Sequence, residues 1–135
     1  EALQVAVYSA VQSDAALTAL IGDAVYDAPL PGHAPDLPET YVLLGEERVR
    51  DASTKTSEGA VHDLTVTVVT RAEGFRQAKA VAAAVCDVLD DADLALSVGH
   101  LVALRFLSAR ADRNTSRAPR RITLRFQAVV EAAAA

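Results

Sequence analysis

The side chains that could do chemistry are few, and their spacing fits no catalytic or metal-binding pattern. His33, His62 and His100 are far apart in the sequence, and none is paired with another histidine or cysteine at metal-ligand spacing. Cys86 falls on the apolar stripe of a helical pattern, where burial raises the pKa of a thiol and makes it inert. No phosphate-binding loop, dinucleotide fingerprint or serine nucleophile elbow occurs. We therefore expect no enzyme, no cofactor and no metal site.

Four aspartates gather near the end of that helical pattern: Asp87, Asp90, Asp91 and Asp93. Their oxygens could suggest calcium, but in the run from Asp91 the position that needs glycine in an EF-hand loop is occupied by Leu96. Acids at a helix C-terminus also meet the negative end of the helix dipole, which costs about 0.3–1 kcal/mol at an exposed site. A local rule broken in this way favours an external partner.

Arginines give the last part of the chain a charge opposite to the rest. Residues 1–99 carry six Lys/Arg and sixteen Asp/Glu, a net charge of −10, whereas residues 100–135 carry seven Arg and two acids, a net charge of +5. The seven arginines all belong to one expected hairpin: Arg105, Arg110, Arg113, Arg117, Arg120, Arg121 and Arg125. This asymmetry is the strongest compositional signal in the sequence.

Three roles are open for these arginines. They can form a solvated face with no partner. They can bind nucleic-acid phosphates, although the protein is acidic overall and the hairpin lacks a set of aromatic side chains on which bases would stack. They can also contact the aspartates at the helix end, or Glu46 and Glu47, of a neighbouring subunit. A head-to-tail contact of this kind closes into a ring where the rotation permits it.

Hydrophobic periodicity predicts the helices that surround these residues. Apolar residues recur at helical spacing over about residues 2–12 and again up to Gly22. Ser13 and Asp14 between them are good N-cap residues, so we expect two helices separated by a cap, with one unbroken helix as the alternative. A longer amphipathic helix is expected over about residues 75–89. Residues 24–27 can form a short strand.

Two longer strands form the central hairpin. The first, Tyr41–Arg50, begins apolar and ends charged, and the second, Val61–Thr70, alternates apolar and polar side chains. They are joined by a polar loop that is too long for a tight two-residue turn. Such a loop is typical of a contact element, and its candidate contact residues are Asp51, Lys55 and Glu58.

The C-terminal hairpin shows the same alternation. One strand places Val102, Leu104 and Phe106 on the expected buried face. The other strand does so with a longer set: Ile122, Leu124, Phe126, Ala128 and Val130. Arg121 and Arg125 share the opposite face, and Arg105 is a candidate to join them. The remaining arginines of the hairpin are further candidates for contact with a partner, among them Arg110, Arg113 and Arg117.

This order of elements favours an α+β fold. We expect a single twisted antiparallel sheet of about four main strands with two helices packed on one face, in the order helix, short strand, two strands, helix, two strands. The length predicts one domain, residues 1–131, followed by an alanine tail, residues 132–135, that frays. No apolar run reaches the roughly 20 residues of a membrane helix, so no membrane contact is expected.

Several short motifs occur in a fixed order along the chain. They are Leu3–Tyr8, Asp14–Leu17, Val25–Pro29, Thr40–Glu46, Ser53–Gly59, His62–Val66 and Val85–Leu89. In this order and spacing the chain resembles the tail-completion, or tail-terminator, family of long-tailed phages, prophages and alphaproteobacterial gene transfer agents. The resemblance spans nearly the whole chain. The proline-rich segment and the alanine tail are its least similar parts.

The resemblance implies a structural virion protein with no catalytic residues and no small-molecule substrate. Such proteins form a hexameric ring on the head-proximal end of the tail tube, stop tube polymerisation at the finished length and offer a surface to the head side. The implied partners are copies of the chain itself, the tail tube protein and a head-side connector or neck protein. Direct DNA contact is not expected, except across the ring lumen.

The resemblance also implies a location and leaves alternatives. Assembly is expected in the bacterial cytoplasm, and the final position is at the head–tail junction of a phage-like particle. A head-completion or neck connector protein is the alternative structural role. A small nucleic-acid-binding protein is the alternative from another functional class.

Overall fold

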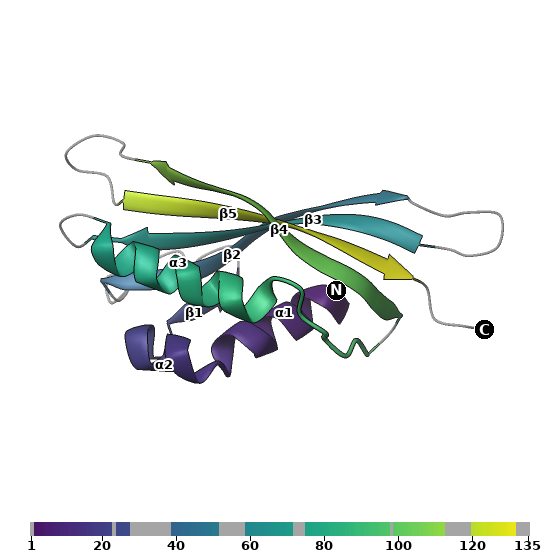
Figure 1. Cartoon of the computed structure of the whole chain (residues 1–135), viewed down its shortest axis with the longest axis horizontal. Coiled ribbons are helices and arrows are strands. Elements are labelled where there is room, and N and C mark those ends of the chain that lie inside the picture. The colour runs from purple at the N-terminus through teal and green to yellow at the C-terminus, as the bar shows by residue number, and fades with distance from the viewer. Residues whose placement is uncertain are drawn as a thin grey trace.

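The structure is a computed structural model, and it describes most of the chain. The described residues are 2–22, 24–27, 39–51, 59–71, 75–97, 99–112 and 120–131. Their elements are α1 (Ala2–Gln12), α2 (Ala15–Ile21), β1 (Val25–Asp27), β2 (Thr40–Asp51), β3 (Gly59–Thr70), α3 (Arg76–Leu89), β4 (His100–Asp112) and β5 (Arg120–Glu131). The strands form one twisted sheet, and the three helices lie together on one side of it (Figure 1). The α+β class and the helices on one face are as predicted.

The sheet is mixed, which corrects the prediction of an antiparallel sheet. Its strand order is β1-β2-β3-β5-β4; β1 pairs with β2 in parallel, and every other pairing is antiparallel. A parallel neighbour requires a connection of about a dozen residues or more, and the segment between Asp27 and Thr40 has that length. The predicted short strand is therefore real, but its direction depends on the connection rather than on its own residues.

The N-terminal helical region is two helices, so the described chain has three helices rather than two. The carboxylate of Asp14 accepts a hydrogen bond from the backbone N–H of Leu17 at 3.0 Å and caps α2. Gly22 ends α2 with a φ of 64°, and its N–H donates to the carbonyl of Thr18. The cap predicted at Asp14 is confirmed, and the unbroken helix is excluded.

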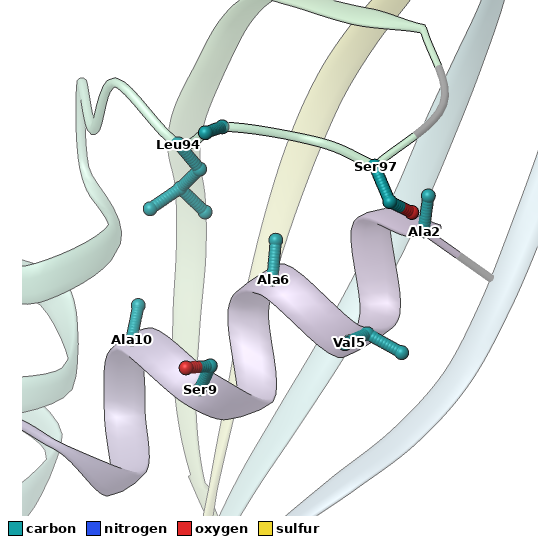
Figure 2. Close-up of a pocket in the computed structure, with 8 residues that line it drawn as sticks. Ala2, Val5, Ala6, Ser9, Ala10, Leu94 and Ser97 are labelled. Atoms are coloured by element: carbon teal, nitrogen blue, oxygen red, sulfur yellow. The ribbon is translucent and has the colours of Figure 1, made fainter.

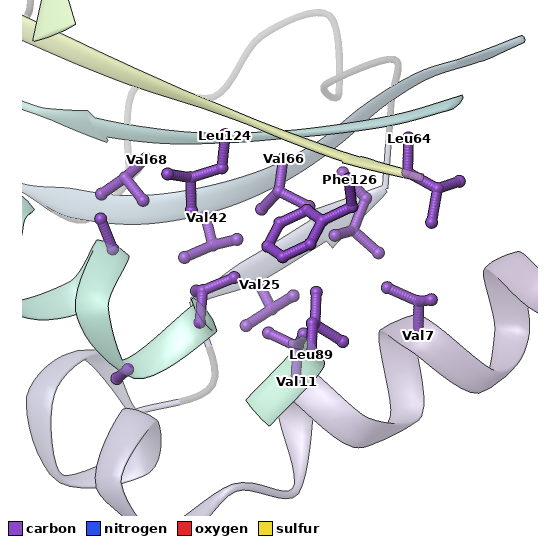
Figure 3. Packing of buried hydrophobic residues seen from close by; sticks show 14 of the residues in the cluster. Val7, Val11, Val25, Val42, Leu64, Val66, Val68, Leu89, Leu124 and Phe126 are labelled. Atoms are coloured by element: carbon purple, nitrogen blue, oxygen red, sulfur yellow. The ribbon is translucent and has the colours of Figure 1, made fainter. Parts of the chain in front are cut away.

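The core lies between the helices and the sheet. Phe126 on β5 is fully buried at its centre, with Val66 and Leu124 beside it on the sheet and Val11 and Leu89 facing it from the helices (Figure 3). The predicted alternation of buried residues in β3 and β5 is confirmed, and so is the apolar stripe of α3. The core consists mainly of small and branched side chains, as the composition predicts.

Two β-bulges change which residues of β4 are buried. Its register with β5 shifts between Leu101 and Ala103 and again between Phe106 and Ser108. Leu101 and Leu104 are buried, whereas Val102 is 50% exposed, so the prediction that Val102 is buried was wrong. An extra residue on one strand disturbs the strict alternation of faces, and the sequence pattern alone did not reveal it.

The prediction that Phe106 is buried with Leu104 also needs correction. Phe106 is opposite Phe126 in the register, and the two rings meet edge to face with centroids 5.7 Å apart. Phe106 nevertheless remains 37% exposed. It belongs to β4, the last strand of the sheet, where no further strand of the described chain covers it.

The opposite face of the sheet carries no helix, and we call it the helix-free face (Figure 1). A small apolar cluster lies at its β1–β2 end, where Ala24, Tyr41 and Val69 are buried. Tyr26 packs against this cluster, with its ring edge to face with that of Tyr41 at 5.8 Å. The other strands of this face, β3, β5 and β4, expose mainly polar and charged side chains.

Candidate functional site

The helix-free face brings together four arginines from the C-terminal hairpin. Directly opposed residues in antiparallel strands point to the same face, so the register assigns each side chain to a face. Arg105 is opposite Gln127, Arg110 is opposite Thr123, and Arg121 and Arg125 follow the same alternation on β5. All four arginines are exposed. We call Arg105, Arg110, Arg121 and Arg125 the arginine face.

The arginine face agrees with the sequence prediction and extends it. Arg121 and Arg125 were expected to share a face, and the register confirms that Arg105 joins them. Arg110 also belongs there, although its spacing from Arg105 is odd and predicts the opposite face in a regular strand. The bulge between Phe106 and Ser108 supplies the extra residue that returns Arg110 to the same face.

No salt bridge of the described residues involves these four arginines, although Arg121 lies opposite Asp112 in the register. The two salt bridges found among those residues join Arg50 to Asp63 at 3.3 Å and His62 to Glu47. Arg120 is separate from the group, because its guanidinium carbon lies 5.7 Å from the centroid of the Phe75 ring. The arginine face is therefore a patch of exposed positive charge on a protein whose net charge is −5.

The aspartates in the last turn of α3 and just after it form the second charged surface. Asp87, Asp90, Asp91 and Asp93 are all exposed, and we call this group the acidic end of α3. The Oδ1 atom of Asp90 accepts a hydrogen bond from the backbone N–H of Phe106 at 3.0 Å. The backbone N–H of Asp91 donates to the carbonyl of Leu104 at 2.8 Å. These bonds attach the acidic end to the outer edge of β4.

This attachment gives Asp90 a role that the sequence analysis missed. The N–H of Phe106 points away from β5, on the side of β4 where the described sheet has no further strand. An edge N–H needs an acceptor, and the Asp90 carboxylate supplies one. The sequence signal was only an acid at an unfavourable helix position. The partner of that acid lies 16 residues away, so local rules could not identify it.

The histidines and the cysteine form no reactive site in the described residues. His62 is hydrogen-bonded to Glu47, His100 is exposed at the start of β4, and His33 lies outside the described residues. Cys86 is partly buried, and burial raises the pKa of its thiol, with the carboxylates of Asp90 and Asp87 raising it further. No group of three or more potential metal ligands occurs among the residues that the structure describes.

A groove lies between α1 and the segment after α3. It has a volume of about 380 Å³, and Figure 2 shows it between Ala6 on α1 and Leu94. Its described lining is apolar apart from Ser9 and Ser97, and none of these lining residues has a titratable side chain.

Comparison with known proteins identifies the family. The family described as "Tail completion protein gp17" matches residues 5–131 of this chain. The chain belongs to this family of tail completion proteins. A solved structure entitled "Virion of native gene transfer agent (GTA) particle" contains a chain with 55% sequence identity and a TM-score of 0.86. The match covers 96% of this chain and 94% of that one. No relative was found among curated proteins.

Family membership gives the two charged surfaces their context. A tail completion protein acts by contact with other virion proteins, so exposed charges that form no salt bridge within the described protomer are candidate contact sites. None of the helices in the described residues has the length and apolar character of a membrane span.

The structure reaches only some of the contact residues predicted from the sequence. Asp51 is exposed at the end of β2, but Lys55 and Glu58 lie outside the described residues. Arg113 and Arg117 lie outside them as well. Glu47 was an alternative acidic partner between subunits, but its hydrogen bond to His62 within the same tail completion protein engages it locally. The other alternative, Glu46, has no described side chain.

Proposed function

We propose that this protein is a structural component of a phage-like particle of the gene-transfer-agent type and completes its tail. The observation that carries the proposal is the match to the tail completion family over residues 5–131, together with 55% identity to a chain of a gene transfer agent virion. At that identity over nearly the full length of both chains, a common structural role follows more readily than from a shared fold alone.

In this proposal, copies of the protein form a ring at the head-proximal end of the tail tube. The ring has six subunits, stops the addition of further tube protein and joins the finished tail to the neck. The partners are the protein itself, the tail tube protein and a head-side connector. Assembly takes place in the bacterial cytoplasm, and the ring remains at the head–tail junction of the released particle.

The described surface supports a contact role over a catalytic one. Charge is segregated into an arginine face on the sheet and an acidic end on α3, and neither is neutralised by an ion pair within the described protomer. Complementary charge of this kind steers association and sets the register between partners. A head-to-tail arrangement of one chain that carries both signs closes into a ring where the rotation between neighbouring subunits permits it.

Deletion of the gene tests this function. Particles from the deletion strain, imaged by negative-stain electron microscopy, are expected to show overlong tails, unattached heads or both. Supplying the wild-type gene from a plasmid should restore tail length and head attachment, which controls for effects on neighbouring genes. Tails of normal length that remain joined to heads in the deletion strain would refute the proposal.

The same images separate the tail role from the alternative in the neck. Loss of the protein that ends the tube should broaden the distribution of tail lengths. Loss of a head-side connector should leave finished tails of uniform length beside separate heads. Measuring tail length and head attachment on the same micrographs therefore assigns the position.

A further inference from the structure

We infer that the arginine face binds the acidic end of α3 of a second copy of this chain. The inference rests on the proposed ring and identifies two surfaces that would meet in it. Arg105, Arg110, Arg121 and Arg125 form one side of the contact. The other side is the acidic end of α3, of which Asp87 and Asp93 make no side-chain hydrogen bond or ion pair in the described protomer.

Within one protomer the two surfaces adjoin at β4 but form no salt bridge among the described residues. The acidic end is fixed to the outer edge of β4 by hydrogen bonds from Asp91 to Leu104 and from Phe106 to Asp90. It belongs to the helical side of the molecule, whereas the arginine face is on the side without helices (Figure 1). No salt bridge of the described residues joins the two groups. A second copy can supply acids to arginines that form no salt bridge within the described protomer.

The chemistry of the arginine face suits carboxylates. A guanidinium presents a rigid fork of N–H donors that matches the two oxygens of a carboxylate. Thr65, Thr123 and Gln127, which lie opposite Arg125, Arg110 and Arg105, are uncharged. Arg121 differs, because it lies opposite Asp112 in the register with β4. A single exposed ion pair contributes little, so the contact depends on several pairs formed together.

Charge complementarity favours a second copy as the occupant. The acidic end offers four aspartates, Asp87, Asp90, Asp91 and Asp93, to match four arginines, and both sets are built into every subunit. Repetition of the same contact around the ring multiplies its effect, since each subunit donates one surface and accepts with the other. Phosphate groups of a nucleic acid are the other anions that such a face could bind, and the experiment distinguishes them.

The test reverses the charge of residues whose side chains form no hydrogen bond or salt bridge in the described protomer. The first variant is R121E/R125E, which reverses two exposed arginines on β5. The second is D87K/D93K. Asp90 is left unchanged because its carboxylate accepts the Phe106 N–H, and Asp91 because its φ is 58°, a conformation that lysine tolerates less well than aspartate.

Incorporation into particles is the readout. Each variant replaces the wild-type gene in the producing strain, and the protein content of purified particles is measured by immunoblot against the tube protein. Each variant alone is expected to be incorporated about tenfold less than wild type, since like charges would then face each other across the contact. The chain with all four substitutions should recover, because the charges are exchanged and again complementary.

Co-expression gives a sharper version of the same test. Neither variant can pair with itself, but R121E/R125E and D87K/D93K complement each other at both of their surfaces. If the two alternate around the ring, every contact again joins opposite charges. Incorporation of both variants is therefore expected only when they are produced together, and only contact between copies gives this result.

A matched control keeps the outcome specific. R76E/K79E makes the same change in net charge as R121E/R125E, at two exposed positions on α3 away from both surfaces. It should be incorporated like wild type. Circular dichroism and thermal unfolding of each purified variant should match wild type, which excludes misfolding as the cause of a loss.

Three results would overturn the inference. The first is wild-type incorporation of R121E/R125E. The second is a defect in that variant that neither the four-substitution chain nor co-expression relieves. The third is binding of a fluorescent DNA duplex that R121E/R125E abolishes without such rescue, which would assign the arginines to phosphate. Because the deletion phenotype does not depend on these residues, each result leaves the test of tail completion separate.

Discussion

The two faces of the sheet are built from the same strands but differ in burial. On β5, Phe126 points into the core and is fully buried, while Arg125 beside it is exposed on the helix-free face. Three helices cover the first face. No helix or strand of the described chain covers the second, where the only buried hydrophobic cluster of the described residues is the small one at the β1–β2 end. Successive residues of one strand therefore serve stability and contact in turn.

Because the two faces differ in burial, substitutions on them should affect different properties of the protein. A buried side chain has exchanged water for packing contacts, so its removal leaves a cavity and lowers the free energy of unfolding. Substitution of an exposed arginine that forms no ion pair within the protomer should change the free energy of unfolding little. Its effect should appear only when another molecule is present. Changes on the two faces should thus separate stability from assembly.

The largest effect is expected at the centre of the covered face. Phe126→Ala removes a ring that contacts both the sheet and the edge ring of Phe106, and it should lower the free energy of unfolding by about 3–5 kcal/mol. Urea unfolding followed by circular dichroism measures the change. A loss below roughly 1 kcal/mol would show that the core repacks around the site and that the two faces differ less than their burial indicates.

A smaller effect is expected at Gly99, where the segment after α3 enters β4. Its φ is 87°, and a Cβ atom there would lie 2.8 Å from the carbonyl oxygen of Glu131. Gly99→Ala should therefore destabilise the protein by about 1–3 kcal/mol through backbone strain. Thermal unfolding can test this. Gly22→Ala is an informative partner: its φ is 64°, but no neighbouring atom would meet the added Cβ, so its cost should come from the backbone conformation alone.

The helical layer should respond more weakly to loss of its cap. Asp14→Ala removes the acceptor for the Leu17 N–H and should cost about 1 kcal/mol. Asp14→Ser keeps an acceptor at the same position and should retain most of the stability. Equal losses in the two variants, measured by urea unfolding, would mean that the hydrogen bond from the side chain is not what stabilises the start of α2.

The smallest effect on stability is expected on the helix-free face. Arg125→Gln changes an exposed residue without a local partner, so the free energy of unfolding should stay within about 0.5 kcal/mol of wild type. Incorporation into particles should nevertheless fall. A variant that is destabilised as strongly as Phe126→Ala would show that the arginine supports the fold and would remove the contrast between the faces.

Much of this architecture could be predicted from the sequence because the responsible forces are local or periodic. The alternation along β3 and β5 follows from placing one side of a strand in the core, and the stripe on α3 follows from burying one side of a helix. Asp14 predicted the break between α1 and α2, because an N-cap side chain bonds to a backbone N–H within the first turn of its helix. The grouping of Arg121 with Arg125 needed only the period of a strand.

The tertiary structure alone decided the features that depend on partners distant in the sequence. The bulges in β4 expose Val102 and return Arg110 to the arginine face, because they arise from how β4 pairs with β5. The parallel direction of β1 depends on its connection to β2. Asp90 looked misplaced until β4 brought the N–H of Phe106 to its carboxylate. Local sequence sets which side of an element is apolar, whereas pairing between elements sets register, edges and the neighbours of each charge.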